Sequence, residues 1–198
     1  MKDWTGNSKT TYAVLGASNH SLEERAENDF YATPPEAIDY LLNDGGAILS
    51  HKVWECACGK GHLSKRLEEL GYEVRSTDLV DRGYGRGGVN FLNVHEHWDF
   101  DIITNPPYKF AAQFVEHALD IVEPGSRIYM FLKLQFLEGK ARRKLFERKE
   151  LETVYVSSSR INCARNGEFD NSDGSAVAYC WFCWCKGFNG WPTIKWIN

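Results

Sequence analysis

The stretch from Asp101 to Tyr108 constrains the fold more than any other part of the sequence, because a short strand pattern in it runs directly into two prolines. Residues 101–104 are rich in β-branched side chains and predict a buried strand. Neither proline can donate a hydrogen bond to a sheet, so the strand has to end before them. Pro106 also favours extended backbone at Asn105. The stretch therefore predicts a rigid corner at the carboxyl end of a strand, where open α/β sheets bind ligands.

This corner offers two hydrogen-bond acceptors and an aromatic ring. The side-chain oxygen of Asn105 and the backbone carbonyl of Pro106 can together hold a planar amino group by its two hydrogens. The ring of Tyr108 can stack on the plane that carries the group. Two such acceptors would draw the nitrogen lone pair out of conjugation and toward an electrophile. The alternative is a plain strand-to-helix turn, since Asn-Pro is an ordinary turn signal.

Residues 105–108, Asn-Pro-Pro-Tyr after a strand, resemble motif IV of the class I S-adenosylmethionine-dependent amino-methyltransferases. DNA adenine-N6 methyltransferases carry this motif, as do some RNA adenine or guanine methyltransferases and the protein-glutamine methyltransferases. The resemblance implies that Asn105, Pro106, Pro107 and Tyr108 are catalytic, and that Asn105 also borders the cofactor. It does not choose among the three substrate classes.

The bulk composition is that of an ordinary globular protein. The 198 residues are 43% hydrophobic and 25% charged, which predicts one domain. The net charge of -4 counts against tight non-specific DNA binding, although residues 140–149 are strongly basic. No stretch is apolar enough to span a membrane, and the first residues lack the apolar core of a secretory signal. We therefore expect a cytoplasmic protein that does not bind membranes.

The six cysteines do not indicate a metal site or a disulfide framework. Cys180, Cys183 and Cys185 are spaced like metal ligands, but they lie in an aromatic strand pattern in which side chains alternate between faces. That alternation places Cys183 and Cys185 on one face and Cys180 on the other. No second Cys or His pair completes a zinc site, so we expect no metal.

Residues 1–28 are polar and aperiodic and predict a flexible arm, which leaves residues 29–198 as a single domain. Within this domain, Thr33, Pro34 and Glu36 have the pattern of a capped helix start, and the helix is expected to reach about residue 43. Residues 30–34 resemble motif X, Phe-Tyr-x-Thr-Pro. The resemblance implies that Tyr31, Thr33 and Pro34 contact the methionine part of the cofactor.

A strand, a glycine turn and a helix follow over residues 51–70, the arrangement of nucleotide-binding units. The glycines let the backbone approach a ligand, and the helix start offers free amides. Residues 55–61 resemble motif I, although relatives often have proline in place of cysteine at position 56. The resemblance implies cofactor contacts from Glu55, Cys56, Ala57, Gly59 and Gly61.

Two further strands are predicted at residues 72–78 and 89–92. The first ends in Asp78, whose carboxylate can accept both ribose hydroxyls, as in motif II, with Leu79 beside it; Asp78 as a plain helix cap is the alternative. On the second, the resemblance implies that Phe91 packs on the cofactor adenine and Asn90 bonds its amino edge. DNA methyltransferases commonly have aspartate where Asn90 stands.

The second half of the chain continues with a helix at 110–122, a strand at 127–132 that is apolar on both faces, and a basic helix at 139–149. A strand at 151–156, a long loop at 157–173 and an aromatic strand at 175–186 complete it. We predict that the basic helix and the loop flank the substrate, although a solvated charged face is the commoner explanation for such a helix. The candidate substrate-binding residues are Tyr108, Lys109, Arg142, Arg143, Arg160 and Arg165.

Together these patterns predict an α/β fold of the Rossmann-like class I methyltransferase type. Its sheet would be doubly wound, seven-stranded and mostly parallel, with an antiparallel C-terminal hairpin and the family strand order 3-2-1-4-5-7-6. The expected reaction is methyl transfer from S-adenosylmethionine to an exocyclic amino group, by direct attack and without a metal.

The resemblance is greatest to small phage and prophage DNA adenine-N6 methyltransferases, through residues 179–184, so DNA is the expected partner. Only twelve residues follow Lys186, so no separate target-recognition domain is expected. Specificity would then come from loops, from a protein partner or dimer, or be low. The alternatives are an RNA or protein-glutamine methyltransferase and an inactive cofactor-binding module.

Overall fold

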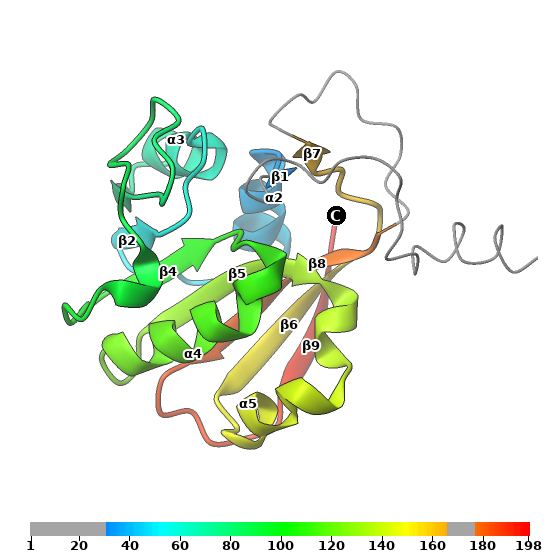
Figure 1. Ribbon diagram of the computed structural model, residues 1–198. Coiled ribbons are helices and arrows are strands. Elements are labelled where there is room, and N and C mark those ends of the chain that lie inside the picture. The colour runs from blue at the N-terminus through cyan, green and yellow to red at the C-terminus, as the bar shows by residue number, and fades with distance from the viewer. Residues whose placement is uncertain (1–30, 166–176) are drawn as a thin grey trace, which may run out of the picture.

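A seven-stranded sheet in the order β3-β2-β4-β5-β8-β6-β9 forms the centre of the protein (Figure 1). The computed structural model describes residues 31–165 and 177–198, so the predicted arm lies outside the described residues. Six strands run in the same direction, and β8 is antiparallel to both of its neighbours. The fold class is therefore confirmed. The strands are β2 (Lys52–Glu55), β3 (Glu73–Ser76), β4 (Asp101–Thr104), β5 (Arg127–Lys133), β6 (Leu151–Ser157), β8 (Tyr179–Cys185) and β9 (Thr193–Ile197).

Helices cover both faces of this sheet (Figure 1). One face carries α4 (Ala111–Ile121) and α5 (Arg143–Glu147), and the other carries α2 (Glu36–Asp39), the π-helical turn η2 (Tyr40–Asp44) and α3 (His62–Glu69). Short 3-10 turns lie at η3 (Phe91–Asn93), η4 (Tyr108–Phe110), η5 (Leu134–Leu137) and η6 (Lys140–Arg142). Outside the sheet, β1 (Tyr31–Ala32) pairs antiparallel with β7 (Ala164–Arg165).

Two apolar cores lie against the two faces, because neighbouring strand residues point in opposite directions. Ile102 and Met130 pack in the core under α4, whereas Ile103 and Phe131 pack in the core under α2 and α3. The central strand β5 is thus buried on both faces, as its sequence predicts. Trp181 on β8 donates its indole N–H to the carbonyl of Ala37, 2.9 Å away, which ties α2 to the sheet.

The predicted strand at residues 89–92 is wrong. Phe91 begins the 3-10 turn η3, and the side chain of Asn90 caps that turn by accepting a hydrogen bond from the amide of Leu92. The edge beside the end of β3 is already taken, because Arg86 in the preceding loop exchanges backbone hydrogen bonds with Ser76 and Asp78. Val89 still donates its amide to the carbonyl of Asp78, but the chain then turns into η3 instead of continuing along this edge.

The seventh strand is β9 at the opposite edge, a strand that the sequence patterns do not predict. It pairs in parallel with β6 from Thr193 to Ile197. The expectation that Thr33 caps the following helix is wrong. The helical segment reaches Asp44, close to its expected end, although from residue 40 it is a π-helical turn. In the basic segment, Leu145 is buried and Ala141 is exposed.

No helix within residues 31–165 and 177–198 combines the length and apolarity needed to cross a bilayer. In the same ranges, no three His, Cys, Asp or Glu side chains are grouped as a metal site. Cys180 packs in one core and Cys183 in the other, so these two thiols lie on opposite faces of β8.

Candidate active site

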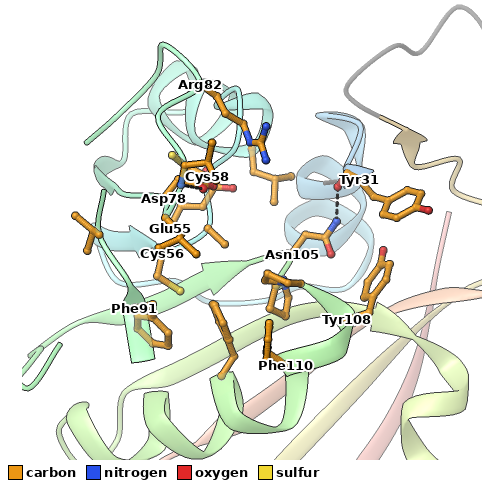
Figure 2. Close-up of a pocket in the computed structure, with 18 of the residues that line it drawn as sticks. Tyr31, Glu55, Cys56, Cys58, Asp78, Arg82, Phe91, Asn105, Tyr108 and Phe110 are labelled. Atoms are coloured by element: carbon orange, nitrogen blue, oxygen red, sulfur yellow. Dashed lines mark hydrogen bonds between the residues drawn. The ribbon is translucent and has the colours of Figure 1, made fainter. Parts of the chain in front are cut away.

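A cavity of about 490 Å³ opens at the carboxyl ends of β2 and β4 (Figure 2). Its volume lies within the range of small-molecule sites, roughly 300–1,000 Å³. It brings together most of the residues singled out from the sequence, although they come from separate segments of the chain. Those lining it are Tyr31, Thr33, Glu55, Cys56, Ala57, Asp78, Leu79, Asn90, Phe91, Asn105, Pro106, Pro107, Tyr108 and Lys109.

Asn105 is fixed by two hydrogen bonds to the motif X segment. Its Nδ2 donates to the backbone carbonyl of Tyr31 at 2.9 Å and to Oγ1 of Thr33 at 2.8 Å. A backbone carbonyl can only accept, so the amide nitrogen has to face Tyr31. The other end of the amide, Oδ1, is buried and has no hydrogen-bond partner among the described residues. Buried polar atoms are rarely left unpaired, so Oδ1 is suited to a donor on a ligand.

Asp78 organises the turn after β2 as well as the end of its own segment. Its Oδ2 accepts from the amide of Gly59 at 2.8 Å, and its Oδ1 accepts from the amide of Val80 at 2.9 Å. Each carboxylate oxygen has a second lone pair, so the group can still accept from a diol. The carboxylate thus lies on the cavity wall in a fixed orientation.

Gly59 and Gly61 do not line the cavity. Both have a positive φ, of 56° and 79°, which a glycine adopts without strain. A side chain at Gly61 would collide with the ring of Tyr84, which packs directly over this glycine. The second glycine therefore makes room for a tyrosine of the 77–89 loop rather than for a ligand.

Glu55 is buried beneath the cavity at the end of β2, with an exposed fraction of 2%. It accepts a hydrogen bond from the hydroxyl of Ser64, which itself accepts from the hydroxyl of Ser76 at 2.7 Å. Burial outweighs these hydrogen bonds and raises the pKa of Glu55 to about 8. The carboxyl is accordingly mostly protonated at neutral pH.

The apolar wall is backed by the core under α4. Phe91 packs edge-on against Trp54, with ring centroids 5.3 Å apart, and against Phe114 at 5.0 Å. Both neighbours are buried, so the Phe91 ring is held in place. Such a rigid aromatic surface suits a flat apolar ligand group.

Tyr108 stands in a column of aromatic rings. The ring centroid of Tyr31 is 5.9 Å away with an interplanar angle of 28°, and that of Tyr179 is 6.0 Å away with an angle of 30°. The ammonium of Lys133 lies 5.0 Å from the Tyr108 ring centroid. Burial raises the pKa of the Tyr108 phenol well above its ordinary value, so the hydroxyl stays neutral.

Several predicted residues lie outside the cavity. Pro34 and Arg160 line a second, smaller hollow. The backbone of Arg165 pairs with that of Tyr31, which places β7 beside the motif X segment. Arg142 and Arg143 lie on η6 and α5 and are not among the residues that line the cavity. The geometry thus does not place these two arginines at the site.

Arg142 instead closes the turn that precedes it. Its guanidinium donates to the carbonyls of Phe136, at 2.8 Å, and Gln135, at 3.2 Å, and also to that of Glu138. We expect Arg142→Ala to lower the free energy of unfolding by about 1–2 kcal/mol, because several carbonyls lose a charged donor. The matched control is Arg143→Ala. Arg143 is 80% exposed and, among the residues that the structure describes, pairs only with Glu147, so its loss should cost less than about 0.5 kcal/mol.

Urea unfolding of both variants measures this difference. Because carbonyls rather than carboxylates accept from Arg142, raising the salt concentration should leave the Arg142→Ala loss nearly unchanged. Equal stability of the two variants would show that the turn does not depend on Arg142.

Sequence reasoning missed part of the wall. His62 follows the glycine turn directly, and burial lowers the pKa of its imidazole, which therefore stays neutral at pH 7. Burial raises the pKa of Cys58 to about 12, so it contributes a neutral thiol. Both residues lie in or next to motif I, and this position was the sequence signal that could have identified them. The other missed residues are Ala32, Leu63, Val80, Arg82, Val89, Leu92, Phe110 and Phe114.

No protein-family model matches the sequence, and no curated protein matches it. Solved structures do match its fold. A candidate RNA methyltransferase from Pyrococcus horikoshii aligns with a TM-score of 0.57 and 15% identity, covering 91% of this chain and 99% of its own. A candidate class I S-adenosylmethionine-dependent methyltransferase from Listeria monocytogenes aligns with a TM-score of 0.54 and 12% identity, covering 96% of this chain and 71% of its own.

A third match is a modification subunit of a candidate type I restriction enzyme from Vibrio vulnificus. Its TM-score is 0.55 and its identity 14%, over 96% of this chain and 50% of the subunit, so this chain spans half of that protein. At such identities the likeness concerns the fold. The mixed seven-stranded sheet is that of the Rossmann-like class I methyltransferases.

Proposed function

We propose that this chain, which has the fold of the class I S-adenosylmethionine-dependent methyltransferases, transfers a methyl group from S-adenosylmethionine to an exocyclic amino group, most favourably N6 of adenine in DNA. One observation carries the proposal. Asn105 has its amide nitrogen tied to Tyr31 and Thr33, while its buried Oδ1 has no hydrogen-bond partner among the described residues. An acceptor held in this way suits an amino group.

The cavity fits the cofactor in three respects. The Asp78 carboxylate retains acceptor capacity for ribose hydroxyls, and the Phe91 ring offers a flat wall for an adenine. Because burial keeps Glu55 protonated, this residue does not add a second full negative charge to the floor of the cavity. When bound, S-adenosylmethionine supplies an electrophilic methyl group.

The protein's own contribution is orientation. The Asn105 oxygen and the Pro106 carbonyl would accept the two hydrogens of the amino group, which holds its plane and directs the nitrogen lone pair into the cavity. The ring of Tyr108 would lie against the plane of the substrate. Its phenol is neutral, so stacking rather than proton transfer is the role that its environment favours.

DNA is the favoured substrate for two reasons. The Asn-Pro-Pro-Tyr corner resembles that of DNA adenine-N6 methyltransferases. In addition, one protein of the same fold is described as the modification subunit of a type I restriction enzyme, and another solved structure concerns assembly of a type I restriction–modification system. A base inside a duplex has to be turned out of the stack to reach such a corner. A protein partner that supplies target recognition is part of this proposal.

RNA is the second candidate, because another protein of this fold is described as an RNA methyltransferase. Incubating the purified protein with tritiated S-adenosylmethionine and separate pools of DNA, RNA and protein tests the choice. We expect tritium in the N6 position of adenine from the DNA pool. Label confined to RNA or to protein glutamine would overturn the assignment, and cofactor binding without label in any pool would favour an inactive binding module.

The cofactor assignment is tested at Asp78. Asp78→Ala should weaken S-adenosylmethionine binding about 10–150-fold, the equivalent of roughly 1.5–3 kcal/mol for hydrogen bonds to a charged group. Asp81→Ala is the matched control, because Asp81 accepts from Gly83 in the same loop and does not line the cavity. Calorimetric titration measures both, and equal affinities would exclude Asp78 as the ribose ligand.

A further inference from the structure

We propose that Tyr31 contacts the substrate rather than the cofactor, and that its ring and the Tyr108 ring are the two walls of a slot for a flat aromatic base. The slot would make the site selective for a nucleobase over the amide of a glutamine side chain. The inference rests on the proposed function and deepens it, because it adds a residue that recognises the class of substrate.

The rings of Tyr31 and Tyr108 face each other, as the two walls of a slot must. Their centroids lie 5.9 Å apart, and the rings are inclined by 28°. Stacked bases are spaced by about 3.4 Å, so a base with a ring on each face needs about 6.8 Å between the outer rings. The distance between the centroids includes any lateral offset of the rings, so the rings have to part by at least about 1 Å to admit a base.

Tyr31 is the wall that moves. Tyr108 is supported from the sheet, because the Tyr179 ring stacks on it and the Lys133 ammonium lies 5.0 Å from its centroid. Tyr179 and Lys133 are directly opposite each other on β8 and β5. Tyr31 comes from β1, outside that sheet, and its side chain is half-buried. Rotation of this side chain opens the slot without moving a core element.

The backbone of Tyr31 stays in place during this rotation. Its carbonyl accepts from Nδ2 of Asn105, and its residue pairs with Arg165 on β7. The same asparagine thus holds both the wall of the slot and the acceptor for the amino group. A base between the rings would have its edge beside Oδ1 of Asn105.

Figure 2 shows the division of the cavity. Tyr31, Asn105 and Tyr108 lie together at one end, and Glu55 and Asp78 lie at the other. The aromatic pair is therefore at the end remote from the carboxylate proposed for the ribose. This separation is the reason to assign Tyr31 to the substrate.

Two opposed aromatic faces favour a substrate that has a ring. A purine gains stacking on both of its faces, whereas the carboxamide of glutamine has no ring to stack. Loss of one wall should therefore reduce methylation of DNA strongly, but it would barely affect a glutamine substrate. On the scale of base–aromatic stacking, the expected loss is on the order of 10–100-fold.

Initial rates of methyl transfer to mixed-sequence DNA at saturating cofactor test the slot. Tyr31→Leu and Tyr31→Met should each lower kcat/KM for DNA about 10–100-fold, whereas Tyr31→Phe should stay within about threefold. The affinity for S-adenosylmethionine should stay within about threefold in all three variants. Trp196→Ala is the matched control, because it removes an aromatic ring that is 68% exposed on β9, away from the cavity.

A readout independent of activity uses single-stranded oligonucleotides of mixed sequence that contain 2-aminopurine. Stacking between tyrosines quenches this base, so we expect the wild type and Tyr31→Phe to quench its emission, and Tyr31→Leu and Tyr31→Met to quench it less. Leucine and methionine both replace the ring with an aliphatic side chain, so the test still works if one of the two variants does not fold. Thermal unfolding of each variant would reveal such a failure.

The failure of the slot is distinguishable from that of the proposed function. DNA methylation and quenching that are unchanged in Tyr31→Leu and Tyr31→Met would overturn the slot alone. Weaker cofactor binding with unchanged kcat at saturating cofactor would overturn it too, and would return Tyr31 to the cofactor. If wild-type protein did not methylate DNA, the proposed function would fail, but Tyr31-dependent quenching would still support an aromatic slot for a base.

Discussion

Asn105→Ala is expected to lower the rate of methyl transfer by at least about 10²–10³-fold, while the affinity for S-adenosylmethionine changes no more than a few fold. The size of the loss follows from removing a preorganised hydrogen-bonding group from a reacting centre. Cofactor binding should be spared because Asp78 and Phe91, which are proposed to hold the cofactor, lie on other segments. Transfer rates at saturating substrate and calorimetric titration of the cofactor measure the two effects.

Thr33→Val tests how far the orientation of the Asn105 Oδ1 acceptor depends on the hydrogen bond between Asn105 and Thr33. Valine keeps the branched shape and removes only the hydroxyl that accepts from Nδ2 of Asn105. The amide would still donate to the carbonyl of Tyr31, so Oδ1 would keep its orientation less firmly. We expect a loss of about 3–10-fold, on the scale of one neutral hydrogen bond of roughly 1 kcal/mol.

The relative size of the two losses in rate decides the role of Asn105. A large loss in Asn105→Ala with a small loss in Thr33→Val identifies Oδ1 as the group that matters. Equal losses would mean that Asn105 only positions the motif X segment. Tenfold weaker cofactor binding in Asn105→Ala would also contradict the proposed geometry.

Glu55→Gln is expected to flatten the dependence of stability on pH. In the folded state burial raises the pKa of Glu55 from 4.5 to about 8, so between these values the folded protein binds more protons than the unfolded chain. The contribution of Glu55 to the free energy of unfolding is therefore fully present below about pH 4.5 and is lost as the pH rises toward 8. As the pH rises through this window, the free energy of unfolding should fall because of Glu55 alone.

Glutamine has nearly the shape of the protonated carboxyl and can still accept from the hydroxyl of Ser64. At pH 4.5 the variant and the wild type should be similarly stable. At pH 8.5 the variant should be more stable, by an amount of which roughly 5 kcal/mol is the upper limit at 1.36 kcal/mol per pKa unit. This is a large fraction of the stability of an ordinary domain.

Urea unfolding at several pH values between 4.5 and 8.5 measures the effect. Glu116→Gln is the control, because it makes the same substitution at an exposed position on α4. Parallel curves for Glu55→Gln and the wild type would mean that Glu55 is ionised in the folded protein at neutral pH.

Local patterns were sufficient for much of the sheet and for the corner at its edge. The run of β-branched residues before Pro106 predicts where β4 ends, because proline cannot continue a ladder whatever surrounds it. The helical spacing of Phe114, Val115, Ala118 and Leu119 predicts the buried face of α4, and all four are buried. In these cases the residue type and its near neighbours limit the backbone to one outcome.

Local sequence patterns did not predict which segments form the edge strands of the sheet. Residues 89–92 and Thr193–Ile197 both have strand-like composition, yet only the second forms a strand. A strand at the edge depends on a free neighbour, and the 77–89 loop occupies one edge whereas β6 offers the other. Pairing partners are distant in sequence, so no local signal distinguishes the two segments.

The sequence by itself determined many of the residues that gather at the cavity, since motifs at the ends of parallel strands meet at one edge of the sheet. Only the tertiary structure decided what each of them does there. The carbonyl of Tyr31 accepts from Asn105 while its ring lies against that of Tyr108, and Gly61 makes room for Tyr84 because a loop folds back over it. Glu55 is largely protonated because the surrounding core excludes water from it. Each of these outcomes depends on distances between atoms far apart in the chain, which residue order alone does not specify.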